Sequence, residues 1–318
     1  MREKRDFAKR SLVLQSNEAK KKYFLVYEGS KTEEIYFDAV NRLRDEVGIN
    51  PLIELVPVIR DFSEEGWSNP KKILDRLIQN IQYINHESIP YEFLLNRIID
   101  YLYSDLLMPK VKIAKSVMWS FLRKICKEEL AAELDDVVQV DDIEKVGKCI
   151  FAKLKSKYHI AELIDDINEI ISYGKLKYEA GFDKICLIVD RDRESFLSIP
   201  GNNQYDYVVS KCREKGFMLC VTNPCFEFWL LLHYEEVFSL SREALVENAK
   251  KSNKRRYAEH CLREICPKFN KNSYPAEELV RRIDIAIENE KQFCEDVVEL
   301  EHSVGSNIGI LLESMRKA

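Results

Sequence analysis

The 318-residue sequence lacks the cysteine and histidine spacings that hold structural zinc ions. Its nine cysteines form no CxxC motif, and several lie inside apolar stretches, where a free thiol packs as a small hydrophobic group. This scattered pattern argues against both a zinc site and a disulfide framework. His233 and His302 have no partner at a metal-ligand spacing, so we expect a structural role for each.

The sequence also lacks long apolar segments. No apolar stretch is long enough to cross a bilayer, and the first residues show no apolar region typical of a signal peptide. No GxxxxGK[ST] motif is present, so any ATPase activity would have to come from a partner. We therefore expect a soluble, cytoplasmic protein of a reducing compartment that has no membrane partner.

Neither sign of charge dominates the chain. The 49 basic and 54 acidic residues give a net charge of −5, which favours no general affinity for nucleic acid. Basic residues nevertheless gather in an N-terminal arm, 1–22, and in a short segment, 250–256. Either cluster could contact phosphate groups. A solvated tail and a solvated helix face are equally good interpretations of the two clusters.

What the sequence does contain is two short hydrophobic stretches that end in carboxylates. Phe24–Tyr27 leads into Glu28, and Ile185–Val189 leads into Asp190 and Asp192. Such stretches predict buried parallel strands, and open α/β sheets bind ligands where these strands end. Three carboxylates at one edge repel one another unless a cation neutralises them, and oxygen ligands suit Mg²⁺ or Mn²⁺. The pattern therefore predicts a metal site formed by Glu28, Asp190 and Asp192.

A structural interpretation of the same acids is also open. Ser30 and Glu33 have the spacing of a capping box, in which Ser30 would begin a helix. Asp190 and Asp192 could be ordinary turn residues after a strand, because aspartate readily bonds its own backbone there. The coincidence of acids at the ends of two strand patterns favours the metal site.

Strands and helices alternate in both terminal parts of the sequence, which predicts an α/β fold with a parallel sheet. The expected strands are 23–27, 53–59, 185–189 and 217–222. The expected helices are 32–47, 71–85, a segment that ends near 215, 225–234 and a long charged helix over 276–301. Pro57 places the second strand at an edge of the sheet.

Residues 86–179 have a different character. Apolar residues there recur at helical spacing, and strand patterns almost vanish. We expect an all-helical subdomain inserted into the α/β core. The predicted division is a basic arm at 1–22, a core made of 23–85 and 180–318, and the helical insertion at 86–179.

Several motifs of the chain together resemble the RloB family, whose members are similar to the Toprim domain. The motifs are Glu28–Glu33 with Tyr36 and Phe37, Asp190–Asp192, Asn223–His233, and Ser306 with Asn307. The resemblance covers about 21–85 and 183–318 in order, whereas the insertion at 86–179 departs from the compact members of the family. It implies a Toprim-like, Rossmann-like parallel sheet with helices on both faces.

The resemblance also implies a phosphodiester-cleaving enzyme, a metal-dependent nuclease of DNA or RNA with tRNA among the candidate substrates. Such proteins serve bacterial anti-phage or restriction-associated defence, and an ABC- or AAA-type ATPase is the expected protein partner. Asp190 and Asp192 would hold one or two Mg²⁺ or Mn²⁺ ions that align water and stabilise charge on the phosphoryl oxygens. Glu28 would act as a ligand or general base. Glu33 and Lys31 would lie where the start of a helix favours phosphate.

Two asparagines and one more glutamate complete the predicted site. Glu227 lies in a strongly apolar helix, so its burial requires a partner or ligand. A capping box with Asn223, a salt bridge with Arg191 and a role in the site all fit this position. Asn223 precedes a proline and is biased towards an extended backbone, which places its amide near the acids. Asn307 is expected beside the site.

A non-catalytic alternative is a Toprim-like regulatory or nucleic-acid-binding subunit of an ATPase complex. The three acids favour an enzyme, because a scaffold gains nothing from carboxylates that repel one another. Primase-like nucleotidyl transfer fits less well, since the sequence shows no second nucleotide-binding module. The sequence does not distinguish DNA from RNA or one metal ion from two. It also leaves open what activates the protein and whether its copies associate as a homo-oligomer.

Overall fold

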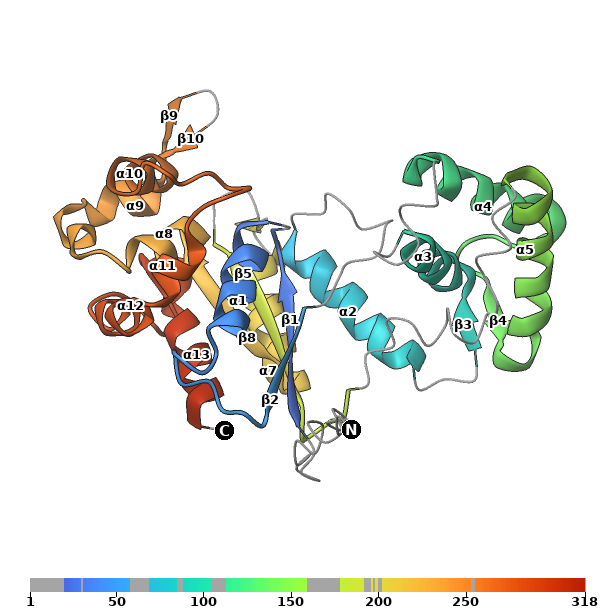
Figure 1. Ribbon diagram of the computed structural model, residues 1–318, viewed down its shortest axis with the longest axis horizontal. Helices are drawn as coiled ribbons and strands as arrows, with labels where there is room; N and C mark the ends of the chain where they lie inside the picture. Colours follow the sequence, from blue (N-terminus) through green and yellow to red (C-terminus); the bar gives the residue numbers. More distant parts are fainter. Residues whose placement is uncertain are drawn as a thin grey trace, which may run out of the picture. The chain divides into compact units, whose positions relative to one another are not determined.

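The computed structural model of the chain describes residues 20–29, 31–57, 69–84, 88–103, 113–158, 178–191, 196, 198–199, 202–252 and 255–317 (Figure 1). By its contacts the chain divides into two compact units. The first unit comprises Met1–Pro57, Glu179–Glu194 and Val209–Ala318, and the second comprises Val58–Tyr178 and Ser195–Val208. Of the predicted basic arm, residues 1–19 lie outside the described part, and Lys21 and Lys22 already belong to a strand.

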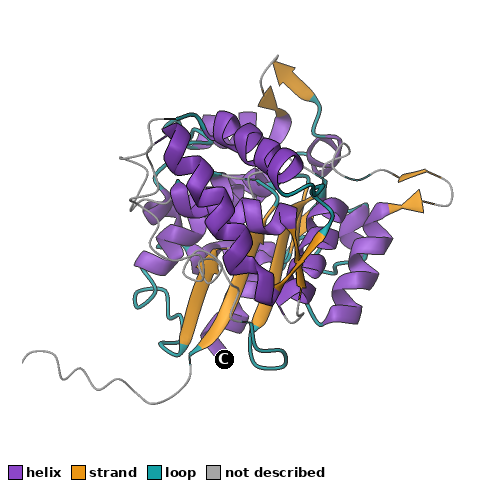
Figure 2. Cartoon of the chain, turned by 90° about the vertical axis from the view of Figure 1, so that its right-hand side faces the viewer, coloured by secondary structure: helices purple, strands orange, loops and turns teal. Residues whose placement is uncertain are grey.

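The first unit is built around a five-stranded, mostly parallel sheet with the strand order β11-β8-β5-β1-β2. Its strands are β1 (Lys21–Tyr27), β2 (Ile53–Pro57), β5 (Lys184–Asp190), β8 (Met218–Asn223) and β11 (Gly305–Ser306). β1, β2, β5 and β8 pair in parallel, and β11 runs antiparallel to β8. Figure 2 shows these strands side by side. The predicted α/β fold with a mostly parallel sheet flanked by helices is therefore confirmed.

Local sequence explains the order of the strands. Phe24–Tyr27 of β1 and Ile185–Val189 of β5 are buried throughout, as two central strands covered on both faces require. β2 lies at an edge, as Pro57 predicted, because proline has no N–H to offer a further strand. Val58 and Ile59, the last residues of the predicted strand, lie outside the described residues.

Helices and a small hairpin complete the first unit. They are α1 (Thr32–Arg42), α8 (Phe226–Leu231), η5 (Glu235–Ser239), α9 (Arg242–Glu247), β9 (Lys250–Ser252), β10 (Arg255–Arg256), α10 (Tyr257–Ile265), α11 (Ala276–Val280), α12 (Ile283–Glu290), η6 (Glu299–Glu301) and α13 (Ile308–Lys317). α7 (Gln204–Lys215) precedes β8 in the chain. The core joins α1 to α8, where the ring of Tyr36 packs edge-on against Phe226 and Trp229. This packing holds α1 and α8 against each other.

The prediction of one long helix over 276–301 is wrong. The segment instead contains α11, α12 and the short η6. The backbone of Cys294 pairs with Gly305, the first residue of β11, and so cannot continue α12. Asp296 then accepts hydrogen bonds from the N–H groups of Val298 and Glu299, at 2.8 and 3.1 Å, which starts a new turn. Long-range sheet pairing therefore overrides a helical pattern that the sequence shows clearly.

Two other predicted helices are shorter than expected. The α-helix α1 ends at Arg42, and turns continue the chain to Gly48, whose φ of 75° only glycine adopts freely. α8 occupies Phe226–Leu231 of the predicted helix at 225–234, and turns follow it. These differences lie at helix ends, where sequence patterns are least informative.

The second unit has a hydrophobic core of its own, formed mainly by helices. Its helices are α2 (Pro70–Ile84), α3 (Tyr91–Leu102), α4 (Lys115–Glu129), η3 (Val140–Asp142) and α5 (Ile143–Tyr158). The expectation that 86–179 is all-helical is wrong in one respect, because β3 (Ser88–Pro90) and β4 (Val137–Gln139) form an antiparallel pair. Ile89 and Val138 lie opposite each other and are buried. Strands of only three residues are too short to show a recognisable alternation in the sequence.

The rest of the second unit is short. β6 (Ser198–Ile199) and β7 (Asn202–Asn203) form a small antiparallel pair. The helical pattern expected near 163–171 lies outside the described residues, and the boundaries at 86 and 179 stay a prediction. In the described part of both units, every helix is too short or too polar to cross a membrane.

Candidate active site at the carboxyl ends of the parallel strands

Glu28 and Asp190 meet at the carboxyl ends of two neighbouring strands, β1 and β5. Glu28 directly follows the last residue of β1, and Asp190 is the last residue of β5. The backbone N–H of Asp190 donates to Oε2 of Glu28 at 2.9 Å, and Glu28 is 8% exposed. The two acids therefore lie together at the sheet edge where the strand patterns place them.

Thr222 of β8 and three other acids set the electrostatics of Asp190. Thr222 lies opposite Asp190 in the sheet, and its Oγ1 donates to Oδ1 of Asp190 at 2.8 Å. Burial raises the pKa of Asp190 well above its ordinary value, and the negative charges of Glu33, Glu28 and Glu227 raise it further. The hydrogen bond from Thr222 opposes this shift without cancelling it. Four carboxylates thus influence one another at this edge.

Glu33 reaches the same edge from the first turn of α1. It is 5% exposed and lies against the backbone of Gly29, where an added Cβ would stand 2.5 Å from both carboxylate oxygens. Glycine at position 29 therefore provides the space that the Glu33 carboxylate occupies. Burial raises the pKa of Glu33, and the charge of Glu227 adds to the shift, whereas backbone hydrogen bonds and the charge of Lys271 oppose it.

The capping-box interpretation of Glu33 does not match the observed helix. α1 begins after its N-cap residue Lys31, whose side chain makes no capping hydrogen bond. Ser30, the N-cap residue of that interpretation, lies outside the described residues. Lys31 is exposed at the start of α1, a position that suits contact with the phosphate of a ligand.

Glu227 brings a fourth carboxylate from the first turn of α8, and it is held by a lysine. It is 3% exposed, and its Oε1 lies 2.7 Å from Nζ of Lys271. The alternative of a salt bridge with Arg191 is wrong, because the guanidinium of Arg191 lies 3.5 Å from Glu301 instead. The Glu227 carboxylate would be unfavourable to bury in an apolar helix without a partner, and Lys271 provides that partner.

Lys271 is a site residue that the sequence analysis missed. Its loop is fixed by a backbone bridge between Asn270 and Ser273 and by two contacts to Thr32, which starts α1. In those contacts Oγ1 of Thr32 donates to the carbonyl of Lys271 at 3.4 Å, and the hydroxyl of Tyr274 donates to the carbonyl of Thr32 at 2.6 Å. No motif marks a single lysine in a polar turn far along the chain from Glu227, so sequence offered no signal.

Lys271 keeps its positive charge beside Glu227. Partial burial disfavours its ammonium form, but the neighbouring carboxylate of Glu227 outweighs burial and raises the pKa of Lys271 above its ordinary value. The side chain is nevertheless 54% exposed, so the ammonium group sits at the boundary between the acids and solvent. A ligand that approaches the acids meets this positive charge.

The chemistry of the cluster fits a hard divalent cation. All of its donors are carboxylate oxygens, and burial together with the neighbouring acids raises the pKa of Asp190, so a bound cation would stabilise its ionised form. Among the described residues no group of three or more His, Cys, Asp or Glu side chains is arranged to hold a metal ion. Glu28 and Asp190 are the adjacent pair, and the predicted third ligand, Asp192, lies outside the described residues.

The two predicted asparagines bond to the backbone rather than to the acids. Nδ2 of Asn223 donates to the carbonyl of Leu300 at 2.8 Å, which ties the end of β8 to η6. Oδ1 of Asn307 accepts from the N–H of Val221 at 2.6 Å, and its Nδ2 donates to the carbonyl of Leu219 at 3.0 Å. Asn307 therefore extends the pairing of β11 along β8, and both amides position the strand whose Thr222 contacts Asp190.

His233 and Cys225, which lie near the site, are buried and have structural roles. Nε2 of His233 lies 2.9 Å from the hydroxyl of Tyr36, and its Nδ1 faces the carbonyls of Trp229 and Leu230. Burial lowers the pKa of His233 to about 3, so the neutral ring links α1 to α8. Burial also raises the pKa of the Cys225 thiol, which keeps it protonated. His233 therefore has the structural surroundings that we expected.

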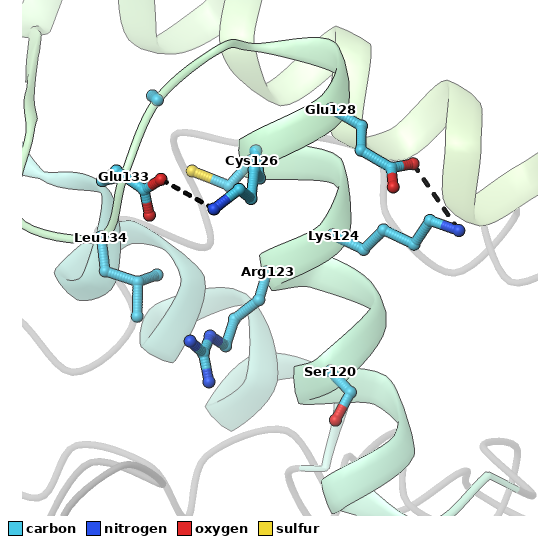
Figure 3. A pocket seen from close by; sticks show the side chains of 9 residues that line it. Ser120, Arg123, Lys124, Cys126, Glu128, Glu133 and Leu134 are labelled. Carbon is cyan, nitrogen blue, oxygen red and sulfur yellow. Dashed lines mark hydrogen bonds and ion pairs between the residues drawn. The ribbon is translucent and has the colours of Figure 1, made fainter.

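A hollow of about 310 Å³ in the second unit has a different character (Figure 3). Its charged lining is mixed: Lys124 pairs with Glu128 at 3.6 Å, and Lys127 pairs with Glu133 at 3.1 Å. Figure 3 shows Arg123 beside these pairs, on the same helix as the two lysines. These positive and negative charges largely compensate one another. The hollow therefore lacks the excess of negative charge found at the ends of β1 and β5.

Comparison with known proteins identifies the family. A family model described as "RloB-like protein" matches residues 23–315, nearly the whole chain. The chain belongs to the RloB-like family. The match includes the stretch 86–179 within its bounds, and the acid cluster of this RloB-like protein lies inside it as well. No curated protein and no solved structure matches the chain.

Proposed function

We propose that this RloB-like protein is a metal-dependent nuclease that hydrolyses phosphodiester bonds of DNA or RNA with Mg²⁺ or Mn²⁺. The observation that carries the proposal is the pair of Glu28 and Asp190 at the ends of β1 and β5, to which Glu33 and Glu227 add negative charge from the first turns of α1 and α8. Burying carboxylates that repel one another costs stability, and a divalent cation is a common compensation. An all-oxygen donor set of this kind suits metal-assisted phosphoryl chemistry.

Each side chain has a role in the proposed reaction. Glu28 and Asp190, with Asp192, would hold the ion, which when bound supplies charge neutralisation and a more acidic water. The N–H of Asp190 fixes the Glu28 carboxylate, so its position does not depend on a freely rotating side chain. Glu33, which is buried and whose charge acts on Asp190, would take a proton from the attacking water. Lys271 would oppose the negative charge that grows on the phosphoryl oxygens.

The proposed biological setting is bacterial anti-phage or restriction-associated defence, with an ABC- or AAA-type ATPase as partner, and membership of the RloB-like family supports it. The sequence has no P-loop, so the partner would supply ATP hydrolysis. A second candidate is a non-catalytic nucleic-acid-binding subunit of such a complex. The observation that favours it is the ion pair of Lys271 with Glu227, which already neutralises one acid without a metal ion.

The test is to incubate the purified protein with tRNA, single-stranded DNA and duplex DNA in Mn²⁺, Mg²⁺ or EDTA. We expect cleavage that requires the divalent ion and that Asp190→Asn and Glu28→Gln each abolish. Glu54→Gln removes the charge of an exposed acid on β2 and is the matched control, which should cleave like the wild type. Equal cleavage by the wild type and Asp190→Asn would refute the nuclease assignment. Nucleic-acid binding without cleavage in any of these conditions would support the non-catalytic subunit.

A further inference from the structure

The described residues of the basic cluster at 250–256 form the two strands of a β-hairpin, Lys250–Ser252 and Arg255–Arg256. β9 and β10 pair antiparallel, with Arg256 opposite Lys250. Figure 1 shows the pair projecting from the start of α10. The side chains of Lys250, Lys251 and Arg255 are exposed. A solvated helix face was one interpretation of this segment, but the structure shows a projecting hairpin that presents positive charge to solvent.

The base of the hairpin is fixed beside the carboxyl end of β8. Asn248, which precedes β9, adopts the left-handed conformation with φ of 44°. Its Oδ1 accepts from the N–H of Ala258, just after β10, at 3.0 Å, so one side chain holds both ends of the hairpin. Its Nδ2 lies 3.9 Å from Sγ of Cys225, the residue that leads from β8 into α8. The hairpin is therefore anchored at the sheet edge that carries the acids.

A series of alternating charges connects the hairpin to the acid cluster. Glu259, in the first turn of α10, lies 3.9 Å from the guanidinium of Arg255 and 4.0 Å from that of Arg263. The same carboxylate interacts electrostatically with Lys271 and Glu227. Arg255 of the hairpin therefore pairs with a carboxylate whose charge also acts on Lys271 of the site. Glu259 links the positive charge of the hairpin to the lysine of the acid cluster.

A polymeric nucleic-acid substrate would be repelled by the acids, so a nearby basic element such as the hairpin would help it to bind. Neighbouring phosphates repeat about every 3.4 Å of rise along a strand, so a bound nucleic acid extends well beyond the phosphate that reacts. The buried carboxylates and the net charge of −5 repel those phosphates. The sequence from 248 to 258 contains five basic and no acidic residues, which offsets that repulsion locally.

We propose that the β9–β10 hairpin binds the phosphate backbone of the nucleic acid whose scissile bond lies at the Glu28–Asp190 edge. The inference rests on the proposed nuclease function for its substrate. Lys250 and Lys251 are the main contacts, because Arg256 donates to the carbonyl of Asn248 and is committed to the base of the hairpin. Contacts of lysine with phosphate carry no sequence information, so the hairpin adds affinity for many sequences rather than selecting one.

The test measures binding in EDTA, where the proposed cleavage cannot occur. Fluorescence anisotropy with a labelled single strand of RNA is followed over a range of KCl concentrations for the full-length protein. Lys250→Glu with Lys251→Glu should weaken binding about tenfold or more and reduce the slope of log K against log salt by about 1.4, the value for two phosphate contacts on a single strand. Lys291→Glu with Lys317→Glu makes the same charge change at the C-terminal ends of α12 and α13 and should bind like the wild type.

Each outcome separates the hairpin from the nuclease. Loss of affinity confined to the hairpin variant supports the inference, even if metal addition to the wild type produces no cleavage and the nuclease proposal fails. Equal affinity and equal salt slope in the wild type and both variants overturn the inference, whatever the protein cleaves. Equal weakening by both variants also overturns it, because binding then reflects net charge alone. A hairpin variant that binds RNA normally but loses binding to poly-glutamate would overturn it in favour of an acidic protein partner.

Discussion

Lys271→Met should destabilise the protein and should do so through Glu227. The substitution keeps a long apolar side chain but removes the ammonium group that lies 2.7 Å from Oε1 of Glu227. Glu227 is 3% exposed, so its carboxylate would be left buried without its ion-pair partner. Burial of an unpaired charge is one of the few single changes that cost stability strongly.

The size of the effect follows from the unequal exposure of the two side chains. Removing one partner of a fully buried ion pair costs about 3–5 kcal/mol, whereas a fully exposed pair is worth about 0.2–1 kcal/mol. The Lys271 side chain is 54% exposed and partly screened by solvent, while Glu227 is not. We therefore expect a loss of about 1–2 kcal/mol in the free energy of unfolding at neutral pH.

Urea unfolding of the wild type, Lys271→Met, Glu227→Gln and the double variant measures this coupling. The double variant should recover most of the stability that Lys271→Met loses, because a buried amide replaces the buried charge. Lys317→Met, which removes an exposed lysine paired with Glu313, is the matched control and should change stability by less than about 0.5 kcal/mol. If Lys271→Met unfolds at the wild-type urea concentration, or the double variant is no more stable than it, the ion pair does not hold Glu227 in the site.

Three other predictions concern neighbouring residues. The raised pKa of Asp190 means that the folded state holds this proton more tightly than the unfolded state. The metal-free protein should therefore lose stability as the pH rises above the ordinary aspartate pKa of about 4, and Asp190→Asn should flatten that slope in urea titrations. Gly29→Ala should displace the Glu33 carboxylate, because the added Cβ would stand 2.5 Å from both of its oxygens. Metal-dependent cleavage should then fall at least about tenfold. Unchanged cleavage would show that Glu33 is not needed. Tyr36→Phe should lower the free energy of unfolding by about 1–3 kcal/mol, because Nε2 of His233 would stay buried without its hydrogen-bond partner. A smaller change would mean that water replaces the hydroxyl.

The part of the site that depends on local pattern could be predicted from sequence. β1 and β5 are short apolar stretches that are buried on both faces, and parallel pairing brings their ends together. Glu28 and Asp190 therefore meet where the strand ends were expected to meet, and Pro57 correctly marks an edge strand. Glu33 and Glu227 follow at the first turns of helices that begin beside that edge.

The part that depends on distant contacts could not be predicted. The Lys271–Glu227 pair joins a polar turn to an apolar helix, and nothing in either segment indicates the other. The amide of Asn307 has the polarity of a ligand-binding group, yet tertiary pairing uses it to extend β8. Cys294 sits in a helical pattern that sheet pairing interrupts. In each case the deciding partner lies far away in sequence, which single-residue patterns do not encode.

We propose that Glu28 and Asp190 form a divalent-metal site that serves phosphodiester cleavage. Titration with Mn²⁺, followed by the electron paramagnetic resonance signal of the free ion, counts bound metal directly and does not require a known substrate. We predict saturable Mn²⁺ binding by the wild type, its loss in the double variant Glu28→Gln with Asp190→Asn, and its retention in Glu54→Gln. Equal Mn²⁺ binding by the wild type and the double variant would show that Glu28 and Asp190 do not hold the ion.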